Sequence, residues 1–193
     1  MDNENMNSIT NHLNLSNPRF LCKAGDEALE VCLKNEVNNP ATPDQLSQLK
    51  RYAGNEYKHL EALYSAFNGL IFHANGVTAG LVVACINQIE GMNDELQDWL
   101  DMMEPEDMAD FQKPGVAFAT IESSGNYFIV YQGRVYYSDH DDFNEAVYAE
   151  SVEDFFKMAL ENPVKFLNDT GCYTRYYDGK SNKQFIPEAF LCD

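Results

Sequence analysis

The segment Gly115–Phe143 constrains the fold more than any other, because it reads as three short strands joined by two tight turns. In Val116–Ile121, alternate residues lie on opposite faces of an extended chain. Tyr127–Tyr131 is aromatic and β-branched throughout, and its apolar residues on both faces predict a central strand that is covered on both sides. Turn residues at Ser123–Asn126, and a glycine before Arg134–Ser138, supply the two connections.

Helix signals lie on both sides of this meander. Thr42 begins a capping box with Pro43 at the first turn, and this helix is predicted to end at Gly54. A second helix is predicted to run to Phe67, and Ser151 begins another capping box. The remaining predicted helices are an earlier short one from Asp26 to Lys34 and an acidic amphipathic one within Met92–Phe111.

Shorter extended segments complete the predicted sheet. They are Leu70–Phe72, Leu81–Ile86 and Ala146–Ala149. We therefore predict an α+β fold: a single domain with a mostly antiparallel sheet of about five to six strands flanked by helices. The predicted domain spans residues 18–193, with a C-terminal extension from about residue 169, and residues 1–17 are predicted to form a mobile polar tail.

The net charge of −18 limits the partners of this chain. Phosphate groups would be repelled, so we expect neither a nucleic-acid partner nor an anionic membrane surface. A strongly acidic protein meets a basic partner quickly, and this favours a basic protein as the partner. The alternative is that the acidity serves solubility alone.

The acidic residues form two groups along the chain. The first lies in Met92–Phe111, which carries eight acidic residues and no lysine or arginine. The second group follows the meander and consists of Asp139, Asp141, Asp142, Glu145, Glu150, Glu153 and Asp154. If both groups lie on one side of the fold, they form one negative field. The candidate partner-binding residues are Asp98, Trp99, Asp101, Asp139, Asp141, Asp142 and Glu145. For Trp99 the alternative is an ordinary place in the core.

The sequence shows no convincing catalytic centre. Asp139–Asp142 combines carboxylates with His140, which are groups that bind metals and transfer protons. Neighbours in an extended segment point to opposite faces, however, so these four side chains cannot all converge. A metal-dependent hydrolase that uses His140 therefore stays a minor alternative. There is no phosphate-binding loop and no nucleophile elbow, and we expect no cofactor.

The expected location of the protein is the cytoplasm. Five scattered cysteines without a C-x-x-C pair are typical of free thiols in a reducing compartment. The polar N-terminus has no signal-peptide pattern, and no apolar run approaches the length of a membrane span.

The order of these motifs resembles the SUKH superfamily, which includes fungal glucan-synthesis regulators and many bacterial immunity proteins. The resemblance covers about residues 42–168. Its motifs are the helix end Tyr64–Gly69, the acidic helix with Trp99, the meander end Val135–Asp141 and the helix start Ala149–Phe156. It implies an α+β fold, no enzymatic activity and, in bacteria, a cytoplasmic antidote that blocks a cognate toxin, often a nuclease. The alternative implied by the fungal members is a regulatory scaffold.

Overall fold

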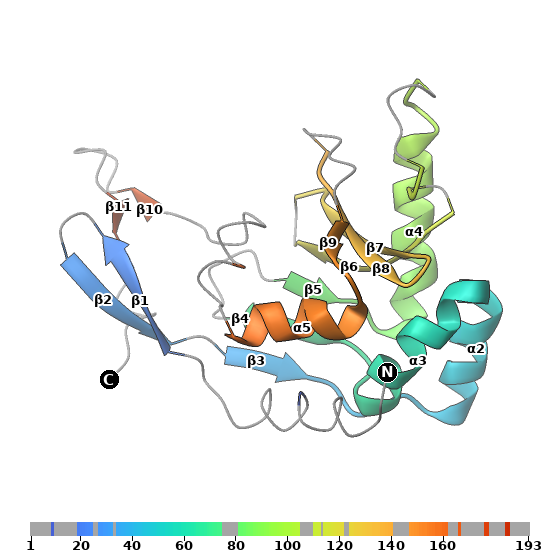
Figure 1. Cartoon of the computed structure of the whole chain (residues 1–193), viewed down its shortest axis with the longest axis horizontal. Coiled ribbons are helices and arrows are strands. Elements are labelled where there is room, and N and C mark those ends of the chain that lie inside the picture. Colours follow the sequence, from blue (N-terminus) through green and yellow to red (C-terminus); the bar gives the residue numbers. More distant parts are fainter. Residues whose placement is uncertain are drawn as a thin grey trace.

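A seven-stranded antiparallel sheet forms the centre of the molecule (Figure 1). The computed structural model describes residues 9, 19–24, 27–32, 34–74, 81–104, 110–112, 114–121, 124–140, 147–161, 166, 176–177 and 184–185. The strands lie in sequence order: β3 (Lys34–Val37), β4 (Leu70–Ala74), β5 (Leu81–Val83), β6 (Val116–Ile121), β7 (Tyr127–Tyr131), β8 (Arg134–Ser138) and β9 (Val147–Ala149). The predicted α+β fold is confirmed, with slightly more strands than the five or six expected.

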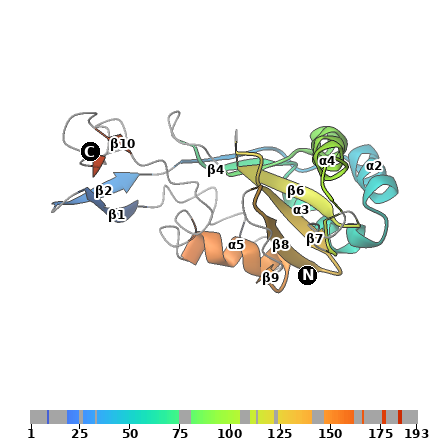
Figure 2. The same cartoon turned by 90° about the horizontal axis from the view of Figure 1, so that it is seen from above.

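The helices cover both faces of this sheet. They are α2 (Pro43–Ala53), α3 (Tyr57–Ala66), α4 (Ile86–Leu100) and α5 (Val152–Glu161), with the 3₁₀ turn η1 (Gly54–Glu56) between α2 and α3. Helix α4 packs against β6, and α5 packs against β8 and β9 on the opposite face (Figure 2). Helix α2 contacts both α3 and α4. No helix in the described part of the chain is long and apolar enough to cross a lipid bilayer.

The predicted meander is confirmed with the bounds expected for its three strands. The central residues of β7, Phe128 to Val130, are fully buried, as expected for a strand covered on both faces. Gln132 and Gly133 form the β7–β8 turn with φ of 51° and 82°. The buried Glu56 carboxylate accepts hydrogen bonds from both of their backbone N–H groups, at 3.0 and 3.2 Å.

Aromatic side chains fill the core between the sheet and α5. Phe118 of β6 and Phe128 of β7 lie against Phe155 of α5, with ring centroids 5.5 and 4.8 Å apart. Phe67 and Phe72 contact Phe156 in the same way. Two of these pairs, Phe118–Phe155 and Phe67–Phe156, are edge-to-face, and such aromatic contacts stabilise the packing of α5 on the sheet beyond the burial of apolar area.

Two small hairpins lie outside the central sheet. Strands β1 (Arg19–Ala24) and β2 (Glu27–Cys32) pair with each other, as do β10 (Tyr176–Tyr177) and β11 (Gln184–Phe185). The predicted helix from Asp26 to Lys34 is therefore wrong. Pairing with β1 supplies β2 with backbone hydrogen bonds from a partner strand, which a reading based on local helix signals does not take into account.

The predicted termini are mostly outside the described residues. Of the predicted tail, residues 1–17, the structure describes Ile9 alone, and its side chain is buried in the hydrophobic core with 6% exposed. The C-terminal extension is described at the paired strands β10 and β11.

Candidate partner-binding surface

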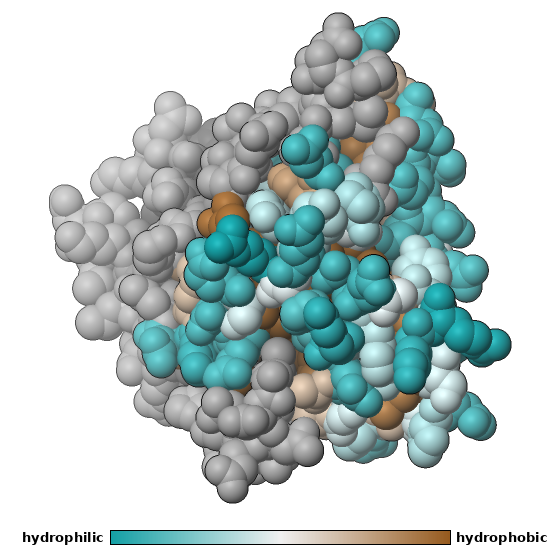
Figure 3. Space-filling model, turned by 45° about the vertical axis from the view of Figure 1, so that its right-hand side comes forward, coloured by the Kyte–Doolittle hydropathy of each residue, from teal (hydrophilic) through white to brown (hydrophobic). Residues whose placement is uncertain are grey.

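Helix α4 presents an acidic face on its exposed side. Its buried side includes Ile89, Leu96 and Leu100. Four exposed carboxylates lie on the rest of the helix: Glu90, Asp94, Glu95 and Asp98. We call these four the acidic face of α4. Figure 3, which brings the right-hand side of Figure 1 forward, shows hydrophilic residues along the edge where α4 and α2 lie.

Counter-charges are missing from this acidic face in the described part of the chain. The chain contains no lysine or arginine between Lys58 and Lys113, and helix α4 has no basic residue in its last turn. Within the described part of the chain, none of the four carboxylates forms an ion pair with a basic side chain. The ion pairs of Arg134 with Glu150, 3.1 Å, and of Lys157 with Glu153, 2.6 Å, lie on other elements.

The charges are unfavourable for the helix that carries them. Glu90, Asp94 and Asp98 are spaced four residues apart, so they are neighbours on the helix surface and repel one another. Asp98 also lies near the negative end of the helix dipole. The negative field extends to Tyr52 of α2, where burial raises the pKa of the phenol and the carboxylates of Asp94 and Glu90 raise it further.

Buried hydrogen bonds hold α4 in place. The Asn93 amide donates to the carbonyl of Ala117 and accepts from its N–H, both at 2.8 Å, where the β6–β7 register shifts between Ala117 and Ala119. Asn68 accepts from the N–H of Ile86 at 2.8 Å and so caps the first turn. Cys85 is the N-cap of α4, and its N–H donates to Gln88 Oε1 at 3.3 Å. These two caps begin α4 at Ile86 and not near Met92, and the predicted strand Leu81–Ile86 ends at Val83.

The end of α4 places two large apolar residues in the acidic region. Trp99 is half-buried and packs against the core, which agrees with the ordinary core alternative. Met102 has 79% of its surface exposed and lies between Asp101 and Glu104 in the chain. Sequence reasoning missed Met102, because its exposure depends on where α4 ends.

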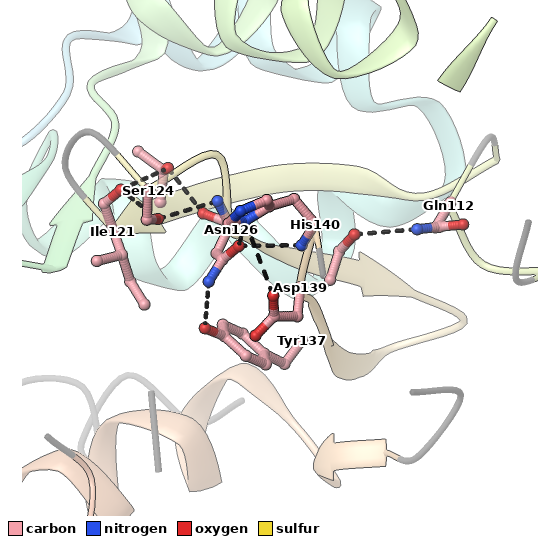
Figure 4. A network of polar contacts seen from close by, with 9 residues as sticks. Gln112, Ile121, Ser124, Asn126, Tyr137, Asp139 and His140 are labelled. Carbon is pink, nitrogen blue, oxygen red and sulfur yellow. Dashed lines mark hydrogen bonds and ion pairs between the residues drawn. The ribbon is translucent and has the colours of Figure 1, made fainter. Parts of the chain in front are cut away.

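The Asp139–His140 pair belongs to a network that closes the end of the meander (Figure 4). Asn126 is the centre of this network: its Oδ1 accepts from the His140 backbone N–H at 3.1 Å and lies 2.7 Å from His140 Nδ1. Its Nδ2 donates to the Tyr137 hydroxyl at 2.8 Å. The Asp139 carboxylate lies 3.8 Å from His140 Nδ1. The His140 imidazole therefore contacts the Asn126 side chain, and the backbone N–H of Asn126 donates to Ser124 in the turn between β6 and β7.

The end of the meander lies beside α4. Glu95 raises the pKa of Tyr127, after the larger effect of burial, so the two side chains are near each other. Tyr127 pairs with Ser138, the residue before Asp139, and Ser138 accepts a 3.0 Å hydrogen bond from Gln112. Asp139 follows Ser138, and Figure 4 shows its side chain on the side of Tyr137, toward α5, so the structure does not bring Asp139 together with the acidic face of α4.

Other predicted site residues are not placed. Asp141, Asp142 and Glu145 lie outside the described residues. Among the residues that are described, no group of three or more His, Cys, Asp or Glu side chains is arranged to hold a metal ion. Cys85 is a free, half-buried thiol whose pKa is raised by burial, so it stays protonated at neutral pH.

No family model matches the chain, and no curated protein matches it with significance.

Proposed function

We propose that this protein is a non-catalytic binding module of the cytoplasm, an immunity protein that neutralises a cognate toxin by presenting its acidic face to a basic surface. The observation that supports the proposal is the acidic face of α4: four exposed carboxylates on one helix, none of which is paired with a basic side chain among the residues that the structure describes. The resemblance to the SUKH superfamily supports the same function.

The energetics favour binding over stability as the role of these charges. Repulsion between neighbouring carboxylates costs a helix about 0.2–0.5 kcal/mol per pair, and negative charge near its C-terminus adds to this cost. Solubility requires no such concentration, since acidic residues spread over the surface would serve equally well. A cationic partner would turn the unfavourable field into a favourable contact.

A nuclease toxin is the partner class that best fits this field. An enzyme that binds nucleic acid presents a basic cleft to the phosphates, and a clustered acidic surface can occupy that cleft in their place. The field also raises the rate of encounter, which suits an antidote that must act before its toxin.

Co-expression with the product of the adjacent gene tests this function. We expect the two proteins to co-purify at low salt, the toxin to lose its activity in the complex, and the complex to weaken as sodium chloride rises from about 0.05 to 0.5 M. A complex whose affinity does not change over this range would contradict an electrostatic interface. A partner that stays active when bound would contradict neutralisation.

A further inference from the structure

A groove of about 660 Å³ lies between α4 and the sheet, next to the acidic face. Its sheet side is a row of residues in register across β5, β6 and β7: Val82, Thr120 and Tyr127. Its helix side includes Gly91 and Glu95, which are one turn apart on α4. The groove therefore combines an apolar floor, an aromatic ring and a carboxylate.

The glycine at position 91 has no structural explanation. It lies within α4 and has no positive φ, and a Cβ built there meets no atom within 4 Å. Glycine in a helix interior costs about 0.5–1 kcal/mol relative to alanine. What glycine does provide at this position is open space, since any larger side chain would project into the groove.

The Glu95 carboxylate makes the groove favourable for a positively charged group. Glu95 is exposed, and it lies near enough to Tyr127 to raise the pKa of that phenol, although burial is the larger cause. No basic side chain in the described part of the chain forms an ion pair with Glu95. A guanidinium group in this position would meet the Glu95 carboxylate and could stack on the Tyr127 ring. Its aliphatic stem would pack along Val82 and Met92.

We propose that this groove receives an arginine side chain of the basic partner. Arginine fits better than lysine, because its planar guanidinium can stack on an aromatic ring and pair with a carboxylate at the same time. This proposal rests on the proposed function and adds to it the site at which the partner is anchored.

A short peptide tests the groove without the partner. We would titrate the full chain with the capped tripeptide acetyl-Gly-Arg-Gly-amide and follow backbone amide shifts by NMR. The expected result is saturable shifts at Gly91, Glu95 and Tyr127. The same peptide with citrulline, the neutral isostere of arginine, should bind about tenfold more weakly, since it lacks the charge that Glu95 and Tyr127 recognise.

Two substitutions on α4 provide the matched comparison. Gly91→Leu should fill the groove and weaken arginine-peptide binding about tenfold or more, while its melting temperature stays the same or rises because leucine favours helix. Asn87→Leu makes a similarly large apolar change at an exposed position outside the groove, and it should leave peptide binding unchanged.

Equal binding of both peptides would overturn the proposal, as would shifts spread over the acidic face that persist in Gly91→Leu. Failure of the proposed function is a separate result. In that case the groove would still bind the arginine peptide, and the chain would form no salt-sensitive complex with the adjacent gene product.

Discussion

At the scale of single residues, Asn93 is the contact on which the position of α4 most depends. Its side chain is 3% exposed and serves both backbone groups of Ala117 as well as the carbonyl of Ile89. Because these partners are buried, removal of the amide leaves hydrogen-bonding groups without water or protein to replace it.

Asn93→Ala should therefore lower the free energy of unfolding by about 2–4 kcal/mol, since two buried backbone groups each lose a partner. Asn87→Ala, a change of the same kind at an exposed position of α4, should change it by no more than about 0.5 kcal/mol. Urea unfolding curves of the two variants measure the difference. Equal losses would mean that Asn93 does not anchor the helix.

His59 gives the stability of the protein a dependence on pH. Burial lowers the pKa of its imidazole from 6.5, an effect that Glu56 partly opposes, and the ring lies against Gly133. Since the folded state prefers the neutral imidazole, this contribution is fully present above pH 6.5 and is lost as the pH falls below it.

The chain should therefore lose more stability between pH 7 and about pH 5.5 than the variant His59→Gln, which has no imidazole to titrate there. Thermal unfolding of both proteins over this range measures the difference. Parallel pH profiles would show that the charge on His59 has no effect on folding.

Hydrogen bonds between residues close in the sequence could be predicted, and hydrogen bonds between residues far apart in the sequence could not. The capping box of Thr42 with Gln45 is present as predicted, and Ser151 accepts from the Asp154 N–H at the start of α5. These bonds span three residues. The bonds of Asn93, Asn68 and Glu56 span 24, 18 and 76 residues, so no local pattern indicates them.

At the scale of elements, the meander was predictable because its strands pair with their sequence neighbours through tight turns. The bounds of β6, β7 and β8 agree with the alternation and turn residues of the sequence. The helix predicted from Asp26 to Lys34 was wrong because β2 obtains its hydrogen bonds from β1. The acidic face of α4 was predictable in part, and the groove beside it depends on the packing of α4 against the sheet.

The acidic face of α4 should lower the stability of the fold. We expect the double variant Asp94→Asn/Asp98→Asn to raise the free energy of unfolding by about 0.5–1.5 kcal/mol at low salt, because it removes like-charge repulsion and a negative charge near the helix C-terminus. The gain should shrink at about 0.5 M salt, where exposed charges are screened.

Asp44→Asn is the control variant, for which we expect the free energy of unfolding to change in the opposite direction. Asp44 lies in the first turn of α2, where the helix dipole favours a negative charge, so its loss should destabilise the protein by about 0.3–1 kcal/mol. Denaturant unfolding at low and high salt covers both variants. Destabilisation by Asp94→Asn/Asp98→Asn would show that the acidic face supports the fold.

At the scale of the whole molecule, charge is unevenly distributed along the chain. Between Lys58 and Lys113 there are ten acidic residues and no lysine or arginine, although the chain carries 13 basic residues in total. The fold places part of this region on the exposed side of α4, and Glu95 at its edge lies near Tyr127 of β7. A partner could therefore recognise either this local negative surface on α4 or only the net charge of −18.

One measurement separates these two possibilities: the affinity of the adjacent gene product for two variants of equal net charge, determined by calorimetry. The variant Asp94→Asn/Asp98→Asn removes two charges from α4, and Glu36→Gln/Glu161→Gln removes two exposed charges from β3 and α5. We predict that the first variant binds at least about tenfold more weakly and that the second binds nearly as well as the unaltered chain. Equal losses, or no loss in either variant, would contradict the role assigned to α4.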